Sequence, residues 1–167
     1  ETGQPPGHEE IRMIEDFLMV FPNNMAPIMG QQLTLGNTYN QSDLDRLVLM
    51  ETRATVAGAF SRSPHAECDL TVRADINGTV TGLLYSVEES RYIASDETRY
   101  SRDQLLSASN SATFLCVPPG DGVRVALDRD MDGYFDAVEL TEGSDPADAG
   151  STPDESWWHR IVKRWFS

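Results

Sequence analysis

The feature that most constrains this chain is the run 128–139, in which carboxylate side chains recur at fixed intervals. Three aspartates occupy alternate positions at its start, a glycine follows, and a glutamate ends it. The positions that can offer oxygen are Asp128, Asp130, Asp132, Tyr134, Asp136 and Glu139. Carboxylates crowded this closely repel one another strongly. The run therefore either surrounds a cation or forms a solvated acidic loop, and the regular spacing favours the cation.

The spacing suits Ca²⁺, a hard cation that takes six to eight oxygen ligands at about 2.3–2.6 Å. The three alternating aspartates offer carboxylates on one side, and Gly133 permits a sharp reversal because it has no Cβ atom. Tyr134 would then contribute its backbone carbonyl, Asp136 would bind directly or through water, and Glu139 would close the site with both oxygens. We therefore expect Ca²⁺ as the cofactor.

This pattern resembles the twelve-residue EF-hand loop at every ligand position. An EF-hand has a helix on each side, whereas here residues 123–127 alternate as in a strand, and only 136–142 predicts a helix, ending at Gly143. The loop is therefore more similar to the dockerin or thrombospondin type 3-like calcium loops of secreted proteins. Residues 143–146, Gly-Ser-Asp-Pro, resemble the Gly-Thr-Asp-Pro that follows such loops in bacterial surface and periplasmic proteins. The resemblance implies a lone structural calcium site rather than a paired calcium sensor.

Outside this loop the hydrophobic pattern has two different periods. Apolar residues recur every three or four positions over 8–21 and 42–57, which predicts two amphipathic helices, the second capped by Ser42. From Cys68 the period is two, and Asn77-Gly78 interrupts it, which predicts a hairpin. Further strands are expected at 31–35, 91–94 and 112–117, and a short helix at 101–107. We expect an α+β fold, a small and mainly antiparallel sheet with helices packed on it.

The chain has two cysteines, Cys68 at the start of one predicted strand and Cys116 near the end of another. Antiparallel pairing of these strands would bring the sulfur atoms within bonding distance and close a loop of about 50 residues. The alternative is two buried free thiols in a reducing compartment. The calcium prediction favours the disulfide, because low-affinity calcium modules and disulfides are both typical of proteins outside the cytosol.

Asn40 and Asn77 each begin an Asn-x-Ser/Thr pattern and are candidate glycosylation acceptors. The second also fits a tight turn, since Asn-Gly is the preferred pair in hairpins. Glu1-Thr2-Gly3 resembles the remnant of a secretion vector, so we expect residues 1–7 to be a tag or linker that precedes one domain over 8–151. Together with the cysteines, these features indicate a secreted, cell-surface or periplasmic location.

The chain carries 13 basic and 27 acidic residues, which gives a formal net charge of −14. Nucleic acid is therefore not expected as a main partner, because binding to phosphates needs clustered Lys and Arg. No apolar run approaches the roughly 18 residues that a membrane-spanning helix needs. The common catalytic motifs are missing, and His65, which lies near Cys68, fits a surface histidine beside a structural cysteine better than a reactive thiol site. We therefore expect no enzyme activity.

Residues 152–167 form a basic and aromatic tail. Apolar side chains repeat there about every four positions, opposite His, Lys and Arg, which predicts an amphipathic helix. Its apolar face carries Trp157, Trp158, Ile161, Trp165 and Phe166. Such a helix can dock on its own acidic domain, bind a partner protein or a second copy of the chain, or lie on a membrane surface. The sequence leaves these alternatives open.

A second resemblance extends over most of the chain. Residues 113–120, which lead toward the acidic run, and Cys68-Asp69-Leu70 resemble the C-terminal region of large bacterial extracytoplasmic proteins that also carry c-type cytochrome segments or β-propellers. The chain has no Cys-x-x-Cys-His, so it cannot attach haem covalently, and the resemblance assigns no activity to its residues. We expect a calcium-binding, non-catalytic structural or interaction module of a larger secreted or surface protein. The alternative is an accessory domain of a periplasmic or extracellular c-type cytochrome electron-transfer protein.

Overall fold

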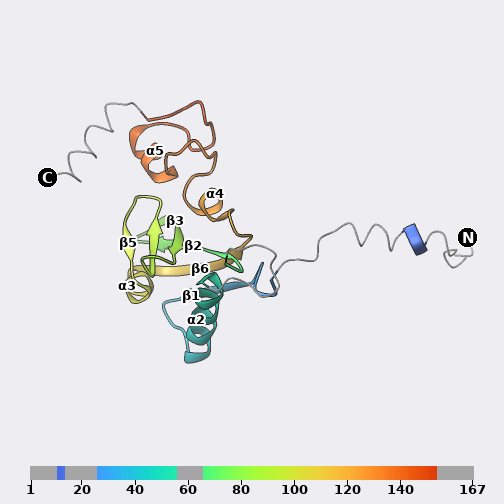
Figure 1. The fold of residues 1–167 in the computed structure, drawn as a ribbon. Helices are drawn as coiled ribbons and strands as arrows, with labels where there is room; N and C mark the ends of the chain where they lie inside the picture. Colours follow the sequence, from blue (N-terminus) through green and yellow to red (C-terminus); the bar gives the residue numbers. More distant parts are fainter. Residues whose placement is uncertain (1–10, 14–25, 56–65, 154–167) are drawn as a thin grey trace, which may run out of the picture.

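The computed structural model describes residues 11–13, 26–55 and 66–153. Its centre is one antiparallel sheet that separates two groups of helices (Figure 1). Helices α2 (Gln41–Thr55) and α3 (Arg102–Ala108) lie on one face. Helices α4 (Gly122–Ala126) and α5 (Asp136–Glu142) lie on the other side. The predicted α+β fold is confirmed.

The sheet has six strands in the order β1-β6-β2-β3-β4-β5. They are β1 (Gln32–Gly36), β2 (Asp69–Ile76), β3 (Thr79–Ser86), β4 (Arg91–Ala94), β5 (Arg99–Tyr100) and β6 (Ser109–Val117). Every neighbouring pair is antiparallel. The last strand in the chain, β6, therefore lies inside the sheet, between β1 and β2. The strands predicted at 31–35, 91–94 and 112–117 are confirmed as β1, β4 and β6.

The β2–β3 hairpin turns at Asn77 and Gly78, as the Asn-Gly pair predicts. These two residues have φ angles of 54° and 83°, and the turns that match the twist of a hairpin require such positive values. Ile76 and Thr79 pair directly on either side of the turn. The hairpin is thereby confirmed, and glycosylation of Asn77 stays a prediction.

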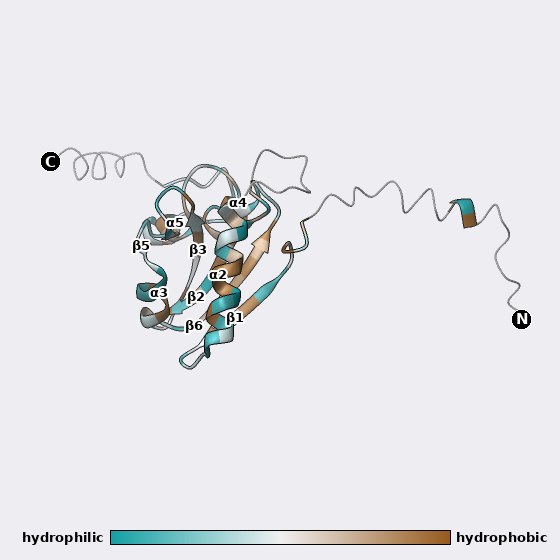
Figure 2. Cartoon of the chain, turned by 60° about the horizontal axis from the view of Figure 1, so that its bottom comes forward, coloured by the Kyte–Doolittle hydropathy of each residue, from teal (hydrophilic) through white to brown (hydrophobic). Residues whose placement is uncertain are grey.

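Helix α2 packs its apolar side on β1, β2 and β6. Polar and apolar residues alternate along it in Figure 2, as expected of an amphipathic helix. The predicted cap, Ser42, is wrong because the helix begins one residue earlier. Asn40 accepts a hydrogen bond from the backbone N–H of Asp43 at 3.1 Å, and the Asp43 carboxylate accepts from the Asn40 N–H at 3.0 Å. This reciprocal pair satisfies two backbone donors at once, and Ser42 is already inside the helix.

The core between α2 and the sheet contains the predicted disulfide, which joins Cys68 to Cys116. Their Cα atoms are 5.4 Å apart, inside the usual range for a disulfide. The antiparallel pairing of β2 with β6 brings them together, since Cys116 lies opposite Leu70, two residues from Cys68. The disulfide prediction is confirmed.

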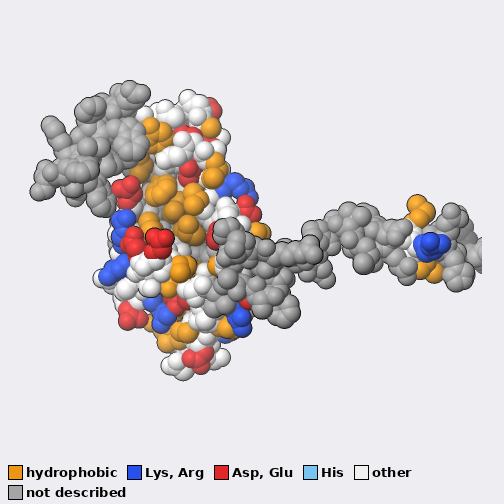
Figure 3. Space-filling view, in the orientation of Figure 1, with side chains coloured by type: hydrophobic (Ala, Val, Ile, Leu, Met, Phe, Trp, Pro, Cys, Tyr) orange, Lys and Arg blue, Asp and Glu red, His pale blue; other side chains and the backbone are white. Residues whose placement is uncertain are grey.

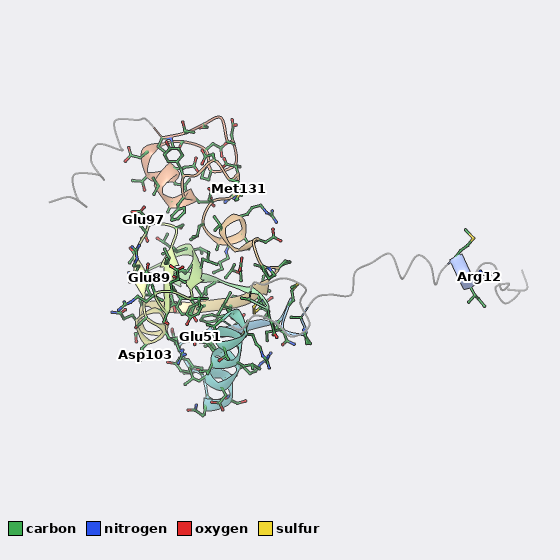
Figure 4. All side chains as sticks on the ribbon, in the orientation of Figure 1. Arg12, Glu51, Glu89, Glu97, Asp103 and Met131 are labelled. Carbon is green, nitrogen blue, oxygen red and sulfur yellow. A yellow bond between two sulfur atoms is a disulfide. The ribbon has the colours of Figure 1, made fainter. Side chains whose placement is uncertain are left out.

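Glu51 is a charged group buried in the same core, on α2 (Figure 4). The Tyr92 hydroxyl donates to its carboxylate at 2.6 Å, and the Arg102 guanidinium donates to both carboxylate oxygens. Burial and the neighbouring Glu51 charge raise the pKa of Tyr92. Each of the three groups has a partner, so this network ties α2 to β4 and α3 without leaving an unpaired buried charge.

Candidate calcium site

The segment before the acidic loop is the helix α4, and the strand predicted over 123–127 is wrong. Gly122 and Ala126, one helical turn apart, face the sheet and are buried, whereas Val123 and Val125 are exposed. The inward face of this helix thus consists of its smallest residues, and the alternating valines that suggested a strand point to solvent. The loop therefore has a helix on each side, α4 before it and α5 after it.

Glycines on both sides of the contact allow α4 to lie very close to the sheet. A Cβ atom on Gly82 of β3 would lie 2.0 Å from the carbonyl oxygen of Ala126, and one on Gly122 would lie 2.7 Å from the Cβ atom of Asp69. The Asp69 carboxylate also accepts hydrogen bonds from the N–H groups of Gly120 at 2.8 Å and Gly122 at 3.0 Å. These contacts fix the position of α4, which leads directly into the acidic loop.

The first three predicted ligands converge at the start of this loop. One carboxylate oxygen from each of Asp128, Asp130 and Asp132 lies within 4.8 Å of the others. The N–H groups of Met131 and Gly133 donate to the two oxygens of Asp128 at 2.7 and 3.0 Å, which holds the loop curled around it. Gly133 has a φ angle of 100°, so the reversal expected at this glycine is present.

Glu139 lies on α5, is fully buried, and is within range of the charges of Asp132 and Asp130. One of its oxygens accepts a hydrogen bond from the Ser144 hydroxyl at 3.3 Å. Its other oxygen is buried without a hydrogen-bond donor, and so is one oxygen each of Asp130 and Asp132. Buried polar atoms are nearly always paired, because an unpaired one keeps the cost of its lost hydration. Three such oxygens on one acidic loop fit a bound cation.

Asp136 is paired with Arg129 and is not part of the aspartate triad. Its two oxygens accept from the backbone N–H of Arg129 at 2.9 Å and from the Arg129 guanidinium at 3.2 Å. The N–H of Tyr134 donates to Asp132 at 2.8 Å, which keeps this residue beside the cluster. The structure therefore brings Asp128, Asp130 and Asp132 together, and Glu139 is buried where the charges of Asp130 and Asp132 act on it. Tyr134 and Asp136 stay predicted ligands, and the ninth position of such loops often acts through water.

The electrostatics of the cluster favour protons or a cation. Burial raises the pKa of Glu139, and the charges of Asp132 and Asp130 raise it further. Burial also raises the pKa of Asp130, with added contributions from Asp132 and Asp128. A divalent cation would favour the ionised carboxylates instead, because an opposite charge stabilises the charged form.

These shifts predict a pH dependence that calcium reverses. In the unfolded chain the carboxyl groups ionise at about pH 4 to 4.5. The folded, cation-free protein holds the protons of Asp130 and Glu139 more tightly, so it binds more protons than the unfolded chain. The contribution of these groups to stability is therefore largest below that range and is lost as pH rises through their raised pKa values. With calcium bound, stability should instead increase with pH, because the ion competes with protons for the carboxylates.

The measurement compares wild type with Glu139→Gln by urea unfolding between about pH 4.5 and 7.5. The amide has nearly the same shape and does not titrate. In protein freed of metal on a chelating resin, Glu139→Gln should become increasingly more stable than wild type as pH rises. In saturating calcium at neutral pH the order should reverse, because the variant has lost a charged ligand. If the difference in stability between the variant and wild type does not change with pH in metal-free protein, the raised pKa of Glu139 is contradicted.

Two residues that support the site were missed from the sequence. Asp69 holds the start of α4, and nothing near it in the sequence marks that role, because its partners lie more than 50 positions away. Ser144 holds Glu139, and here a signal was present, since it belongs to the Gly-Ser-Asp-Pro run after the loop. Ser144 also follows Gly143, whose φ angle of 86° ends α5 as predicted.

The aromatic tail, the N-terminal helix and the glycosylation of Asn40 stay predictions. The tail with Trp157, Trp158, Ile161, Trp165 and Phe166 lies outside the described residues, and so does most of the helix predicted over 8–21. Asn40 is exposed and caps α2, and its glycosylation stays a prediction. Across the described ranges, no helix combines the length and the apolar character needed to cross a membrane.

No family model matches the chain, and neither a curated protein nor a solved structure matches it.

Proposed function

We propose that this chain is a calcium-binding, non-catalytic extracytoplasmic module that serves as a structural or interaction domain of a larger secreted or surface protein. The observation that carries the proposal is the set of three buried carboxylate oxygens without hydrogen-bond donors, on Asp130, Asp132 and Glu139. With Asp128 they place four carboxylates in one loop. A divalent cation would supply these oxygens with a partner and relieve the repulsion between them.

The donor set favours calcium over other metals. All four carboxylates offer oxygen, the ligand that hard cations prefer, whereas structural zinc sites use Cys and His. Mg²⁺ demands near-octahedral geometry and keeps several waters, whereas Ca²⁺ accepts six to eight ligands in flexible arrangements. Backbone carbonyls and water could complete such a shell around this loop. Among the described residues, the aspartate triad is the one group of metal-ligating side chains close enough to hold an ion.

The position of the loop supports a structural role for the ion. On one side, α4 is fixed to β2 and β3 through Gly82 and Asp69. On the other side, α5 supplies Glu139, and a backbone hydrogen bond of 2.8 Å from Asp136 to Leu127 joins the two ends of the loop. Calcium bound between them would tie α5 to the sheet through α4. The disulfide is consistent with an oxidising compartment, where calcium at millimolar levels would saturate a site with a Kd of about 10⁻⁴–10⁻³ M.

Calcium is expected to raise the melting temperature, and Asp128→Ala is expected to abolish this effect. At a free concentration ten times the Kd, the ion should add about 1.4 kcal/mol to the free energy of unfolding. For a domain of this size the melting temperature should then rise by roughly 3–6 °C. Differential scanning calorimetry in calcium and in chelator measures this rise in melting temperature.

The matched control is Glu88→Ala, which also removes one carboxylate charge but lies far from the loop in the sequence, in the turn between β3 and β4. It should keep the full response to calcium. Identical melting of the wild-type protein in calcium and in chelator would refute the proposed function.

A further inference from the structure

A groove lies between the β2–β3 hairpin, α4 and α5, with a volume of about 520 Å³. This volume lies in the range of about 300–1,000 Å³ that is typical of ligand sites. Its charged lining consists of Arg73, Arg124, Arg129 and Asp136. Three positive charges and one negative give this lining a net charge of +2, whereas the whole chain carries −14. We call it the arginine groove.

The three guanidinium groups differ in how they are paired. The guanidinium group of Arg124 lies 3.6 Å from the carboxylate of Asp121, and that of Arg129 lies 3.2 Å from the carboxylate of Asp136. Arg73 is exposed on β2 and has no ion pair with any residue that the structure describes. Guanidinium groups bind carboxylates with two parallel hydrogen bonds. When Asp121 is counted as well, three positive and two negative charges leave a net charge of +1 at the groove, and a positive concave surface concentrates anions locally.

The same groove carries apolar side chains that solvent reaches. Val80 is 58% exposed, Val125 48% and Leu140 68%, and all three line the groove. Figure 3 shows hydrophobic side chains gathered on this side of the molecule, between α5 and the sheet. Aliphatic surface beside guanidinium groups fits a ligand that combines carboxylates with aliphatic side chains. An acidic peptide has both, whereas an anionic polysaccharide has little to bury against Val80 and Leu140.

The walls of the groove come from two parts of the fold that calcium would join. Arg73, Val80 and Gly82 belong to the sheet. Arg129 and Asp136 are the second and ninth residues of the acidic loop, and Leu140 follows on α5. The position of the second wall therefore depends on how firmly the loop holds α5. An ion bound by Asp128 and Glu139 would fix that wall opposite the sheet.

From these observations we infer that the arginine groove binds acidic peptide segments with aliphatic side chains, and that bound calcium strengthens this binding. The calcium dependence rests on the proposed function, whereas the charge and apolar lining of the groove do not. Because coupling between two sites is reciprocal, the peptide should raise the affinity for calcium by the same factor.

The test uses the full chain and a fluorescein-labelled peptide, Glu-Leu-Asp-Val-Glu with a blocked C-terminus, followed by fluorescence anisotropy at low ionic strength. In saturating calcium the wild type should bind this peptide. The double variant Arg73→Gln/Arg124→Gln should bind at least about tenfold more weakly, since the loss of even one charge-assisted hydrogen bond is worth a factor of about ten or more. Arg91→Gln on β4, outside the groove, is the matched control and should bind as the wild type does.

The calcium arm repeats the titration in chelator and with Asp128→Ala. Both should weaken peptide binding, while the double arginine variant should keep its calcium-dependent melting temperature. Failure of the peptide to bind, or binding of dextran sulfate in its place, overturns the inference even where calcium raises the melting temperature. Equal binding with and without calcium overturns the coupling, and a melting temperature insensitive to calcium identifies failure of the proposed function itself.

Discussion

Replacing Cys68 and Cys116 together with alanine is expected to lower the free energy of unfolding by about 4 kcal/mol. The two residues are 48 positions apart, so the bond removes much of the conformational freedom of the unfolded chain. Both are buried in the core, where they join the start of β2 to the end of β6. For a domain of this size, the melting temperature should fall by roughly 10 °C.

Urea unfolding with and without a reductant separates this effect from a packing defect. Reductant should bring the wild-type protein close to the stability of the double variant and leave the variant unchanged. The increase in melting temperature with calcium should persist in the variant, because α4 and the loop are fixed to β2 and β3 and not through the disulfide. Equal stability of the oxidised wild type and the variant would show that the bond does not constrain the unfolded chain as expected.

The parts of the fold that local chemistry determines could be predicted from the sequence. The alternation after Cys68 and the Asn77-Gly78 pair act within a few residues, and they predicted the β2–β3 hairpin. The cysteine pair even indicated that β2 and β6 are neighbours. The place of β1 on the far side of β6 could not be predicted, because it depends on contacts between segments about 80 residues apart in the chain.

The same distinction applies to the candidate site. The convergence of Asp128, Asp130 and Asp132 could be predicted because their spacing along one loop is itself the signal, and Glu139 stays a predicted ligand. The helix α4 could not be predicted, because its position depends on its close contact with Gly82, which lies in another element, on β3. The arginine groove was missed for a similar reason. Its charged residues come from β2, α4 and the loop, and none of them forms a basic cluster in the sequence.

Gly82→Ala tests this non-local contact and should destabilise the protein by about 1–3 kcal/mol, the usual cost of overpacking. The new Cβ atom would lie 2.0 Å from a backbone carbonyl oxygen, that of Ala126, so no side-chain rotation can relieve the clash. Either α4 moves away from β3 or the strand distorts. Chemical unfolding in chelator measures the loss of stability without any contribution from calcium.

Gly36→Ala on β1 is the matched control, because a Cβ atom there meets nothing within 4 Å. It should be neutral or slightly stabilising, since alanine restricts the unfolded chain more than glycine does. The decisive readout is calcium affinity, measured by isothermal titration. Ala126 is two residues before Asp128, so displacing α4 should misplace the first ligand and weaken calcium binding in Gly82→Ala alone. If Gly82→Ala bound calcium like the wild type, the loop would hold its geometry without its anchor on the sheet, and α4 would not be what positions the ion.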